Sequence, residues 1–330
     1  SQHFARNNFI CFLFFMSFIF SKKLPEIFPS QVMVDLTEVC NLGCVHCPHP
    51  SFKSSSFYSK KMLDEKLNEK MIEEVSTTGK NNTQYIRYTS NGEPLVHPKS
   101  YKMINDAVRF SKTKVTLTTN GTLMNESRIE KIFNSGLHMI DISIDAYLVE
   151  TYSRVRVGGD LNITKSNVLK FIKLSKSKDI KTKVVVSFVE QKENSHEIND
   201  FIKFWKENGV DEVLIRKLHT NSGNSKLDEF KEKNSKNQKR YPCVYPWERV
   251  VLNPRGYLAF CPTDWYGKSE VKDYRETTIK DTWQEHFYKN LRKQHLDNQF
   301  TNNFCKNCPD WINTSWPHFN ERKRYGDMVE

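Results

Sequence analysis

Short apolar stretches recur along the chain, and a longer segment with helical periodicity separates each from the next. The stretches that predict strands cover residues 31–36, 84–89, 114–119, 139–144, 182–189 and 212–216. The segments that predict amphipathic helices cover residues 63–75, 101–110, 126–134, 163–175 and 196–207. Asp64 lies near the start of the first helix, where an aspartate can cap the helix N-terminus. Gly136 and Gly209 follow two later helices, and glycine is typical of the residue that ends a helix.

Six strand–helix units between residues 31 and 216 predict a parallel sheet wound with helices. A closed barrel of eight such units needs about 250 residues. The pattern therefore predicts an α/β fold with a partial (β/α)6 TIM-like barrel. Polar residues and glycines follow most of the predicted strands, at the ends where active sites lie in such folds.

The chain has a different character on either side of these units. Residues 1–30 form an apolar extension whose longest run, 9–20, is too short to span a bilayer comfortably. We interpret it as a non-essential extension, with a signal h-region or a peripheral membrane contact as the alternatives. Residues 222–240 are polar and rich in lysine and predict a linker after a core of residues 31–221. Residues 241–330, with short strands, tryptophans and four cysteines, predict a small cysteine-rich C-terminal auxiliary domain and tail.

Composition narrows the classes of partner. Of the 330 residues, 38% are hydrophobic and 12% aromatic, which is enough for a packed core. The net charge of +11 is spread along the chain and forms no single basic block, which favours general lysine bias over a nucleic-acid surface. A basic pocket for an anionic small molecule also suits this charge. Trp311, Trp316 and Phe319 near the end are expected to pack in the protein and not to stack on bases.

The first cysteine group directly follows the first predicted strand. It reads Cys40-Asn41-Leu42-Gly43-Cys44-Val45-His46-Cys47, a C-x3-C-x2-C loop. Three thiolates leave one iron of a [4Fe–4S] cluster without a protein ligand, and that iron can chelate a substrate. A structural zinc ion normally takes four ligands, and His46 or His49 can supply the fourth. The loop alone therefore leaves cluster and zinc open.

The residues around this loop resemble the radical S-adenosylmethionine (SAM) superfamily. The family signature is C-x3-C-x-aromatic-C, and His46 fills the aromatic position here. Asn91-Gly92-Glu93-Pro94 is similar to the family loop that grips the amino group of SAM. The resemblance implies that Cys40, Cys44 and Cys47 hold the cluster. It implies SAM contacts for a set of residues at strand ends and after them: Asn91, Gly92, Glu93, Pro94, Asn120, Ser143, Asp145 and Arg156, with Arg154 the alternative to Arg156.

The second cysteine group spans the auxiliary domain. Cys243, Cys261, Cys305 and Cys308 form C-x17-C-x43-C-x2-C, which suits either zinc or a fully ligated cluster. A predicted hairpin with an Asn-Pro-Arg-Gly turn at 253–256 precedes the second cysteine. This stretch resembles a SPASM or shortened twitch domain. The resemblance implies one auxiliary [4Fe–4S] cluster, because too few cysteines remain for two. Cys11 belongs to neither group and is predicted to be a buried apolar residue of the extension.

The resemblance implies an enzyme that reductively cleaves SAM to a 5′-deoxyadenosyl radical, which abstracts hydrogen from a substrate. The first hypothesis is oxidation, or epimerisation, of a carbohydrate or aminocyclitol. The auxiliary cluster then accepts an electron, positions the substrate or only braces the domain. A peptide-modifying maturase and a non-catalytic metal-binding protein are the alternatives. A flavodoxin or ferredoxin-type reductant and a cytoplasmic location are implied as well. The motifs name no catalytic residue, but Arg216, Lys217 and His219 follow the sixth strand and are candidates to face the pocket.

Overall fold

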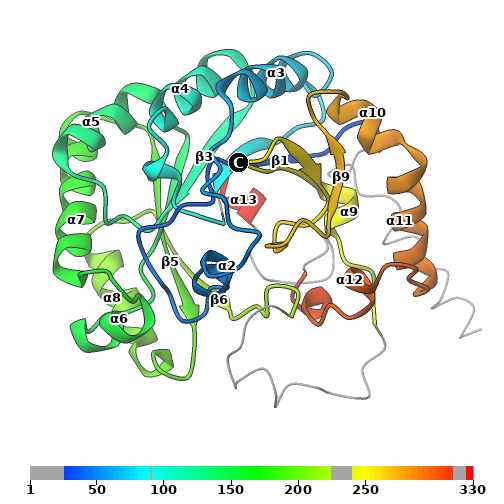
Figure 1. Ribbon diagram of the computed structural model, residues 1–330. Helices are drawn as coiled ribbons and strands as arrows, with labels where there is room; N and C mark the ends of the chain where they lie inside the picture. Colours follow the sequence, from blue (N-terminus) through cyan, green and yellow to red (C-terminus); the bar gives the residue numbers. More distant parts are fainter. Residues whose placement is uncertain (1–25, 90, 224–239, 315–324, 330) are drawn as a thin grey trace, which may run out of the picture.

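The computed structural model describes residues 26–89, 91–223, 240–314 and 325–329 (Figure 1). The predictions for Cys11, Trp316, Phe319 and most of the linker and the N-terminal extension lie outside the described residues. No helix of the described part is long and apolar enough to cross a membrane.

A single nine-stranded sheet runs through the molecule in the order β6-β5-β4-β3-β2-β1-β7-β8-β9. Its strands are β1 Gln31–Asp35, β2 Tyr85–Thr89, β3 Lys114–Thr119, β4 Met139–Ser143, β5 Lys183–Glu190, β6 Glu212–Lys217, β7 Arg249–Leu252, β8 Tyr257–Ala259 and β9 Glu270–Asp273. The six predicted strands are present with ends shifted by at most one residue, and neighbours among them pair in parallel. The predicted partial barrel is confirmed, and β6 and β9 are its two edges.

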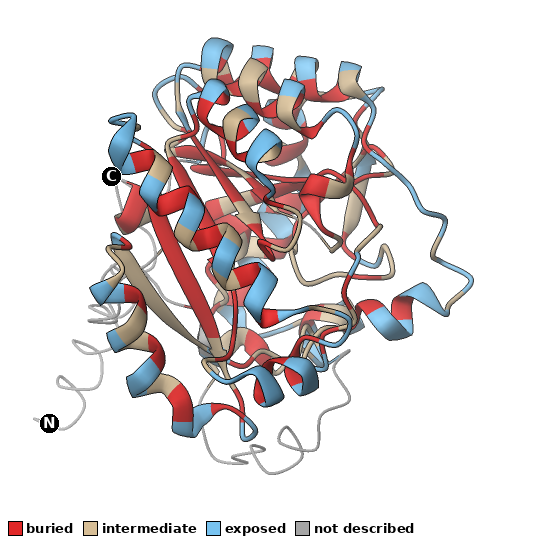
Figure 2. Ribbon diagram, turned by 90° about the vertical axis from the view of Figure 1, so that its left-hand side faces the viewer, coloured by how far each residue is buried: buried red, intermediate tan, exposed pale blue. Residues whose placement is uncertain are grey.

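Helices cover the convex side of the sheet. The five predicted helices are α3 Glu65–Ser76, α4 Ser100–Phe110, α5 Glu126–Ser135, α7 Leu161–Ser177 and α8 Ile198–Glu207, and they form the outer arc of the molecule (Figure 1). Asp64 caps α3 by accepting from the Lys66 N–H. Gly136 ends α5 in the left-handed conformation, at φ 68°. Each helix turns a buried stripe toward the sheet and an exposed stripe outward (Figure 2).

Short helical segments that the periodicity did not predict join these units. They are α2 His49–Lys53 and α6 Val149–Val155, with 3-10 turns at Pro94–Val96 and Ser195–Glu197. Each is at most seven residues long, too short for an apolar period to be recognised.

Along the strands, alternate side chains face the helices, where the main apolar core lies, and the concave side, where both polar and apolar side chains lie. On β1, Val32 and Val34 belong to the main core. Gln31 instead lines a cavity on the opposite side, and Asp35 lies near the cysteine-rich region. These two polar side chains of β1 therefore lie on the concave side of the sheet.

The C-terminal region continues this sheet. Its helices are α9 Tyr245–Glu248, α10 Ile279–Gln284, α11 His286–Asp297, α12 Asn303–Lys306 and α13 Tyr325–Val329, with a 3-10 turn at Asp310–Asn313. β7 pairs in parallel with β1, and β7 and β8 form the predicted hairpin, in which Gly256 takes φ 87°. The pairing with β1 was not predicted, since the cysteine-rich region reads as a separate module in the sequence.

The last described helix, α13, closes the concave side near the beginnings of the strands. Met328 and Val329 pack with Tyr85, Met139 and Val185, which lie early in β2, β4 and β5. Figure 1 draws α13 near the centre of the barrel. The helix therefore forms a floor opposite the strand ends that carry the cysteine loop.

Candidate active site

The three cysteines of the first group line one cavity of about 190 Å³ at the carboxyl ends of the strands. Two backbone hydrogen bonds anchor the loop that carries these cysteines to the segment at the end of α6. Gly43 and Val45 donate backbone hydrogen bonds to Val157 O and Val155 O, at 2.8 and 3.1 Å. The segment that ends α6 thus holds the loop in place, so the thiols of Cys40, Cys44 and Cys47 face the same space.

The chemistry and spacing of these thiols fit an iron–sulfur cluster. Burial raises the pKa of Cys40 to about 11 and that of Cys47 to about 12, so the metal-free thiols keep their protons at neutral pH. A cluster replaces those protons when it binds. The three sulfur atoms do not all lie within 4.8 Å of one another, whereas thiolates around one zinc ion are about 4 Å apart. This separation is wider than a single zinc ion held by all three thiols would require.

Neither histidine of the loop is placed as a fourth ligand. His49 is buried, and its Nε2 lies 3.0 Å from Glu38 O. His46 Nδ1 lies 3.2 Å from the side-chain amide of Gln191, and its Nε2 lies 3.7 Å from Asp145. Both rings are engaged by other groups of the protein, which favours a three-thiolate site.

The Asn91–Pro94 loop closes against the backbone that precedes Cys40. Glu93 N donates to Val39 O at 2.8 Å. The Glu93 carboxylate is buried and accepts from Thr119 Oγ1, Asn120 N and Leu95 N at 2.7, 2.8 and 3.0 Å. Burial raises the pKa of this carboxyl, and the three donors oppose that rise. Glu93 therefore links the ends of β2 and β3, with acceptor capacity left for a ligand ammonium.

Gly92 makes the closest backbone approach of the site. A Cβ added there would lie 2.4 Å from Val39 O and 2.6 Å from Thr37 O. Only glycine fits between these two carbonyls without moving the backbone of the cysteine loop.

Replacing Gly92 with alanine is expected to shift this loop away from the cysteines. We expect the unfolding free energy to fall by about 1–3 kcal/mol, as in other overpacked sites, and SAM to bind less tightly. Denaturant unfolding and equilibrium binding of SAM to the reconstituted protein measure the two effects. Gly43→Ala is the stability control, because its added Cβ would meet its nearest atoms at 3.8 and 3.9 Å. A G92A variant as stable as G43A, with unchanged SAM affinity, would contradict the argument.

The remaining predicted SAM contacts divide into two groups. Asn120 and Ser143 line the cavity with Arg156, but the Asn120 amide is also bonded to Asn41 in the cysteine loop, at 3.0 Å. Asp145 does not line the cavity. Its buried carboxylate accepts from Arg156 Nε at 2.8 Å and from Val189 N at 2.7 Å. The structure thus places the Asp145 carboxylate against Arg156 and the backbone of β5, and its contact with SAM stays a prediction.

Arg156 and not Arg154 reaches the cavity. Arg154 is exposed and bonds only to Thr151 among the described residues, at 3.3 Å. Arg156 is buried and lies beside the first cysteine group. Burial raises the pKa of the Cys44 thiol, and the nearby Arg156 charge acts in the opposite direction. A cation here would stabilise thiolate at the site.

The four cysteines of the second group line another, smaller cavity together with Phe260, Phe304 and Trp311. Burial raises the pKa of Cys261 and of Cys305 to about 12. Two hydroxyl groups approach the sulfurs: Ser222 Oγ lies 3.9 Å from both Cys261 and Cys308, and Thr263 Oγ1 lies 3.2 Å from Cys261. Four thiols in an apolar enclosure fit a fully ligated cluster, with hydroxyl donors to its sulfurs. The assignment of individual ligands stays a prediction.

A third cavity, of about 350 Å³, shares lining residues with the cavities of both cysteine groups. It shares His46 and Val189 with the first cavity, and Tyr245 and Thr314 with the auxiliary one. Arg216, Lys217 and His219 all line it, as considered from the sequence, and Tyr325 of α13 lines it from the opposite side. The sequence missed Arg87 among its lining residues. The available signal was a charged residue at an alternate position of the otherwise apolar β2.

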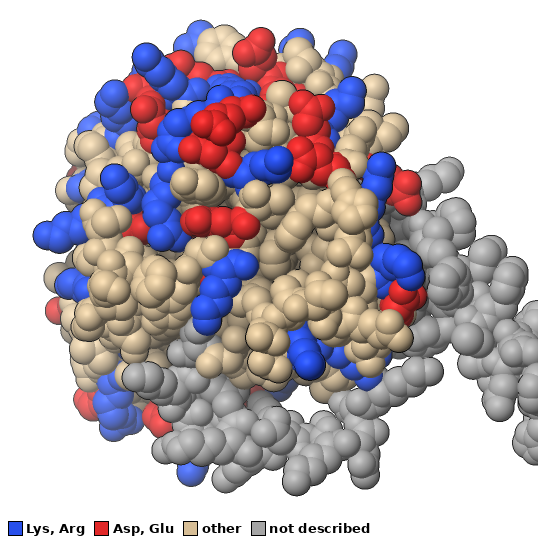
Figure 3. All heavy atoms as spheres, turned by 45° about the vertical axis from the view of Figure 1, so that its right-hand side comes forward, with Lys and Arg blue, Asp and Glu red and all other residues tan. Residues whose placement is uncertain are grey.

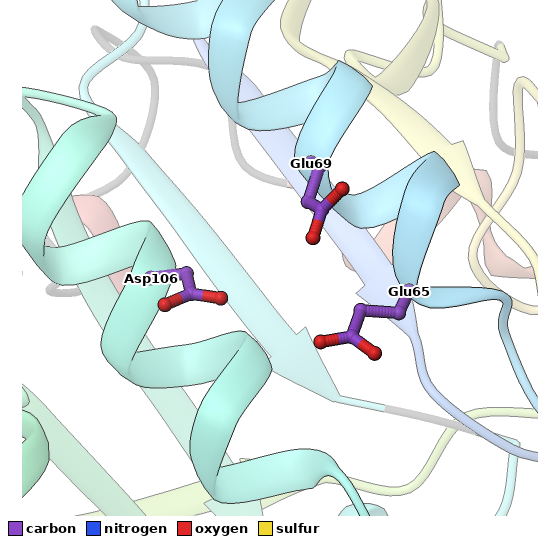
Figure 4. Close-up of side chains that lie close together, drawn as sticks. All are labelled: Glu65, Glu69 and Asp106. Atoms are coloured by element: carbon purple, nitrogen blue, oxygen red, sulfur yellow. The ribbon is translucent and has the colours of Figure 1, made fainter.

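An acidic cluster on the outer helices does not belong to this site. Glu65, Glu69 and Asp106 face one another between α3 and α4 (Figure 4). Lys102 contacts all three carboxylates, and Lys99 also bonds Glu65. Hydrogen bonds from Lys102 and Lys99 lower the pKa of Glu65 to about 2. The two lysines thus offset most of the charge of the three acids, and the cluster reads as a surface ion-pair network.

The surface charge is mixed on the face that Figure 3 presents. Basic and acidic side chains are interleaved over its upper part, and its middle is largely uncharged. This face carries no single-sign field of the kind that nucleic-acid binding favours.

Comparison with known proteins identifies both parts of the chain. The family model of the radical SAM superfamily matches residues 34–204, and that of the iron-sulfur cluster-binding SPASM domain matches residues 243–309. GTP 3′,8-cyclase of Clostridium botulinum is 28% identical over 195 residues, which cover 59% of this chain and 58% of that protein. AdoMet-dependent heme synthase of Methanosarcina barkeri is 32% identical over 128 residues, 39% of this chain and 34% of that one. The chain thus spans less than two thirds of the length of these relatives.

Solved structures share the fold at low sequence identity. BtrN in complex with AdoMet and 2-DOIA is 17% identical with a TM-score of 0.59, covering 85% of this chain and 92% of that one. SuiB of Streptococcus suis bound to precursor peptide SuiA is 16% identical with a TM-score of 0.64, covering 86% and 70%. The two family matches confirm the predicted cofactors, which are SAM, its [4Fe–4S] cluster and an auxiliary cluster. The chain is therefore an enzyme of the radical SAM superfamily with a C-terminal SPASM domain.

Proposed function

We propose that this enzyme removes hydrogen from a small molecule held in the 350 Å³ cavity and oxidises it, with a carbohydrate or aminocyclitol alcohol as the first candidate. The observation that carries the proposal is the position of that cavity, which shares His46 with the SAM-side cavity and Tyr245 with the cavity of the auxiliary cysteines. When bound, SAM and the two clusters supply a hydrogen-abstracting radical and an acceptor for the second electron.

The protein's own residues have three tasks in this scheme. Cys40, Cys44 and Cys47 hold the cluster at the SAM side, and Arg156 is oriented there by Asp145. The cavity walls position the substrate carbon between the two cysteine groups. Oxidation of an alcohol to a carbonyl removes one hydrogen atom, one electron and one proton. Burial lowers the pKa of His219, so its imidazole is neutral at pH 7 and able to accept that proton.

The cavity volume and two relatives support a small molecule. About 350 Å³ falls within the range of small-ligand sites, roughly 300–1,000 Å³. GTP 3′,8-cyclase carries GTP in its name, and the BtrN structure holds AdoMet and 2-DOIA. The SuiB structure holds a precursor peptide. The test must therefore distinguish a peptide substrate from a small-molecule substrate.

The test is anaerobic reconstitution of the full chain, followed by SAM, dithionite and a panel of aminocyclitols, sugars and short peptides. We expect about eight irons per chain and formation of 5′-deoxyadenosine, with one equivalent per turnover for the true substrate. Oxidation gives a product lighter by two hydrogens, whereas epimerisation gives a product of unchanged mass in ordinary water and a deuterium-labelled product in deuterated water. A substrate found only among the peptides, or no SAM cleavage at all, would contradict the proposal.

A further inference from the structure

We propose that the 350 Å³ cavity contains a binding site for an oxyanion, a phosphate or carboxylate group of the substrate, centred on Arg216 and Arg87. This inference rests on the proposed function, since it assumes that the cavity takes the substrate. It adds the chemical class of that substrate, which is an anionic small molecule, and so narrows the candidates to a sugar or cyclitol that carries a phosphate or carboxylate group.

The first argument is an unbalanced charge on the concave side of the sheet. Arg216 Nη2 lies 2.5 Å from Asp141 Oδ2, and Arg87 Nη2 lies 3.4 Å from the same oxygen. Asp141 is fully buried and is the only acid within salt-bridge distance of either arginine among the described residues. Two guanidinium groups thus share one carboxylate, which leaves about one positive charge beside the cavity.

The other charged groups of the cavity wall do not remove this excess. Arg249 pairs with Glu248, and Lys217 pairs with Glu190. Each of these pairs is neutral by itself. Burial lowers the pKa of the nearby His219 most; among its charged neighbours Asp310 raises this pKa, and Arg216 and Arg249 lower it.

The second argument is that Arg87 is held rigidly. Its Nε and Nη2 donate to Thr118 Oγ1 at 3.1 and 2.9 Å. Its guanidinium lies 3.7 Å from the ring centroid of Tyr325, and the Tyr325 hydroxyl lies 3.1 Å from Thr116 Oγ1. The floor helix α13 therefore supports Arg87 from below, and its donors are preorganised at little entropic cost.

The third argument concerns access. The Arg216 side chain is 28% exposed, and Asp141 engages only its Nη2 among the described residues. The rest of its guanidinium borders the cavity. Arginine binds carboxylate and phosphate with paired hydrogen bonds, and these bonds are strong in a partly buried site. An incoming oxyanion would balance the charge that Asp141 leaves uncompensated.

The experiment uses the reconstituted full-chain enzyme with SAM and four probes. Ribose 5-phosphate and glucuronate carry the anion, and ribose and glucose do not. Calorimetry measures the dissociation constant of each probe for the wild type, for Arg216→Gln and for the matched control Arg275→Gln. Arg275 is an exposed arginine that bonds Asp273 away from the cavity.

We expect at least one anionic probe to bind and both neutral sugars to bind more weakly. In R216Q the dissociation constant for that probe should rise about 10- to 100-fold, as for the loss of a charge-assisted hydrogen bond. R275Q should match the wild type. Affinity of the wild type should also fall with added salt, which tests the charge without any variant. The dissociation constants of ribose 5-phosphate and glucuronate show whether the site prefers a phosphate or a carboxylate group.

Two results would overturn the site: equal affinity of the wild type for neutral and anionic probes, or unchanged affinity in R216Q. Basal SAM cleavage, measured as 5′-deoxyadenosine formed without substrate, separates a failure of the oxyanion site from a failure of the proposed function. If the wild-type enzyme cleaves SAM but binds no anion, the oxyanion site is contradicted and the proposed function still stands. If the enzyme binds the anion but never cleaves SAM, the proposed function is contradicted and the oxyanion site still stands.

Discussion

Replacing Cys44 with alanine should abolish SAM cleavage, with a decrease of at least about 10³-fold in the rate of 5′-deoxyadenosine formation. The loop offers three thiols, and removing one leaves two for a cluster that already has an open iron. Among the described residues, the two nearby histidines are already engaged, because His49 bonds Glu38 O and His46 lies between Gln191 and Asp145. We expect about four irons per chain to be lost and about four to remain at the second cysteine group.

His49→Gln is the matched control for this experiment. If the loop held zinc with His49 as the fourth ligand, H49Q and C44A would both lose the metal of the loop, and that metal would be zinc. If the loop holds an open cluster, H49Q keeps its iron and its SAM cleavage, since its amide can still bond Glu38 O. Iron, zinc and sulfide analysis of the two variants therefore decides between the readings that the loop sequence left open.

The second large effect is expected from the double variant Cys305→Ala/Cys308→Ala. These two cysteines lie on and just after α12, and with Cys243 and Cys261 they enclose the auxiliary site. Their loss should remove about four irons while the first cysteine group, in a separate cavity, still cleaves SAM. If the auxiliary cluster is the electron acceptor, oxidised product should fall at least about 10²-fold, a barrier increase of roughly 3 kcal/mol.

The same variant separates an electron acceptor from a structural brace. A brace would show mainly as instability of the region from β7 onward, seen as faster hydrogen exchange there. An acceptor would show as 5′-deoxyadenosine formed without oxidised product. Ser222→Ala is the mild control, because it removes one hydroxyl 3.9 Å from two sulfurs and leaves all four thiols. Product formation that survives in the double variant would contradict the acceptor role.

Local pattern was sufficient for most of the core architecture. Apolar alternation on stretches such as 31–36 reports which side chains face the helices, and that alternation depends only on strand geometry. The Gly136 stop was predicted because a left-handed residue ends a helix locally. The cysteine spacing likewise defined two metal groups, because a loop of eight residues brings its thiols together without help from the fold.

Other features depend on which segments meet in three dimensions. The pairing of β7 with β1 joins strands that are distant in the chain, and no periodicity encodes a partner strand. Ser222 reads as the start of a polar linker in the sequence, and only the fold brings its hydroxyl to Cys261 and Cys308.

The sequence by itself determined the family, the alternation of strands and helices and the two cysteine groups, because each is written in residues that are close along the chain. The tertiary structure decided that Arg156 donates a hydrogen bond to Asp145 and that one cavity shares lining residues with the cavities of both cysteine groups. It also decided that Arg87 and Arg216 share Asp141. The physical reason is that the charge balance at the arginines and the walls of the cavity depend on side chains from several strands. The positions of these side chains follow from the order and register of the strands, which local periodicity does not specify.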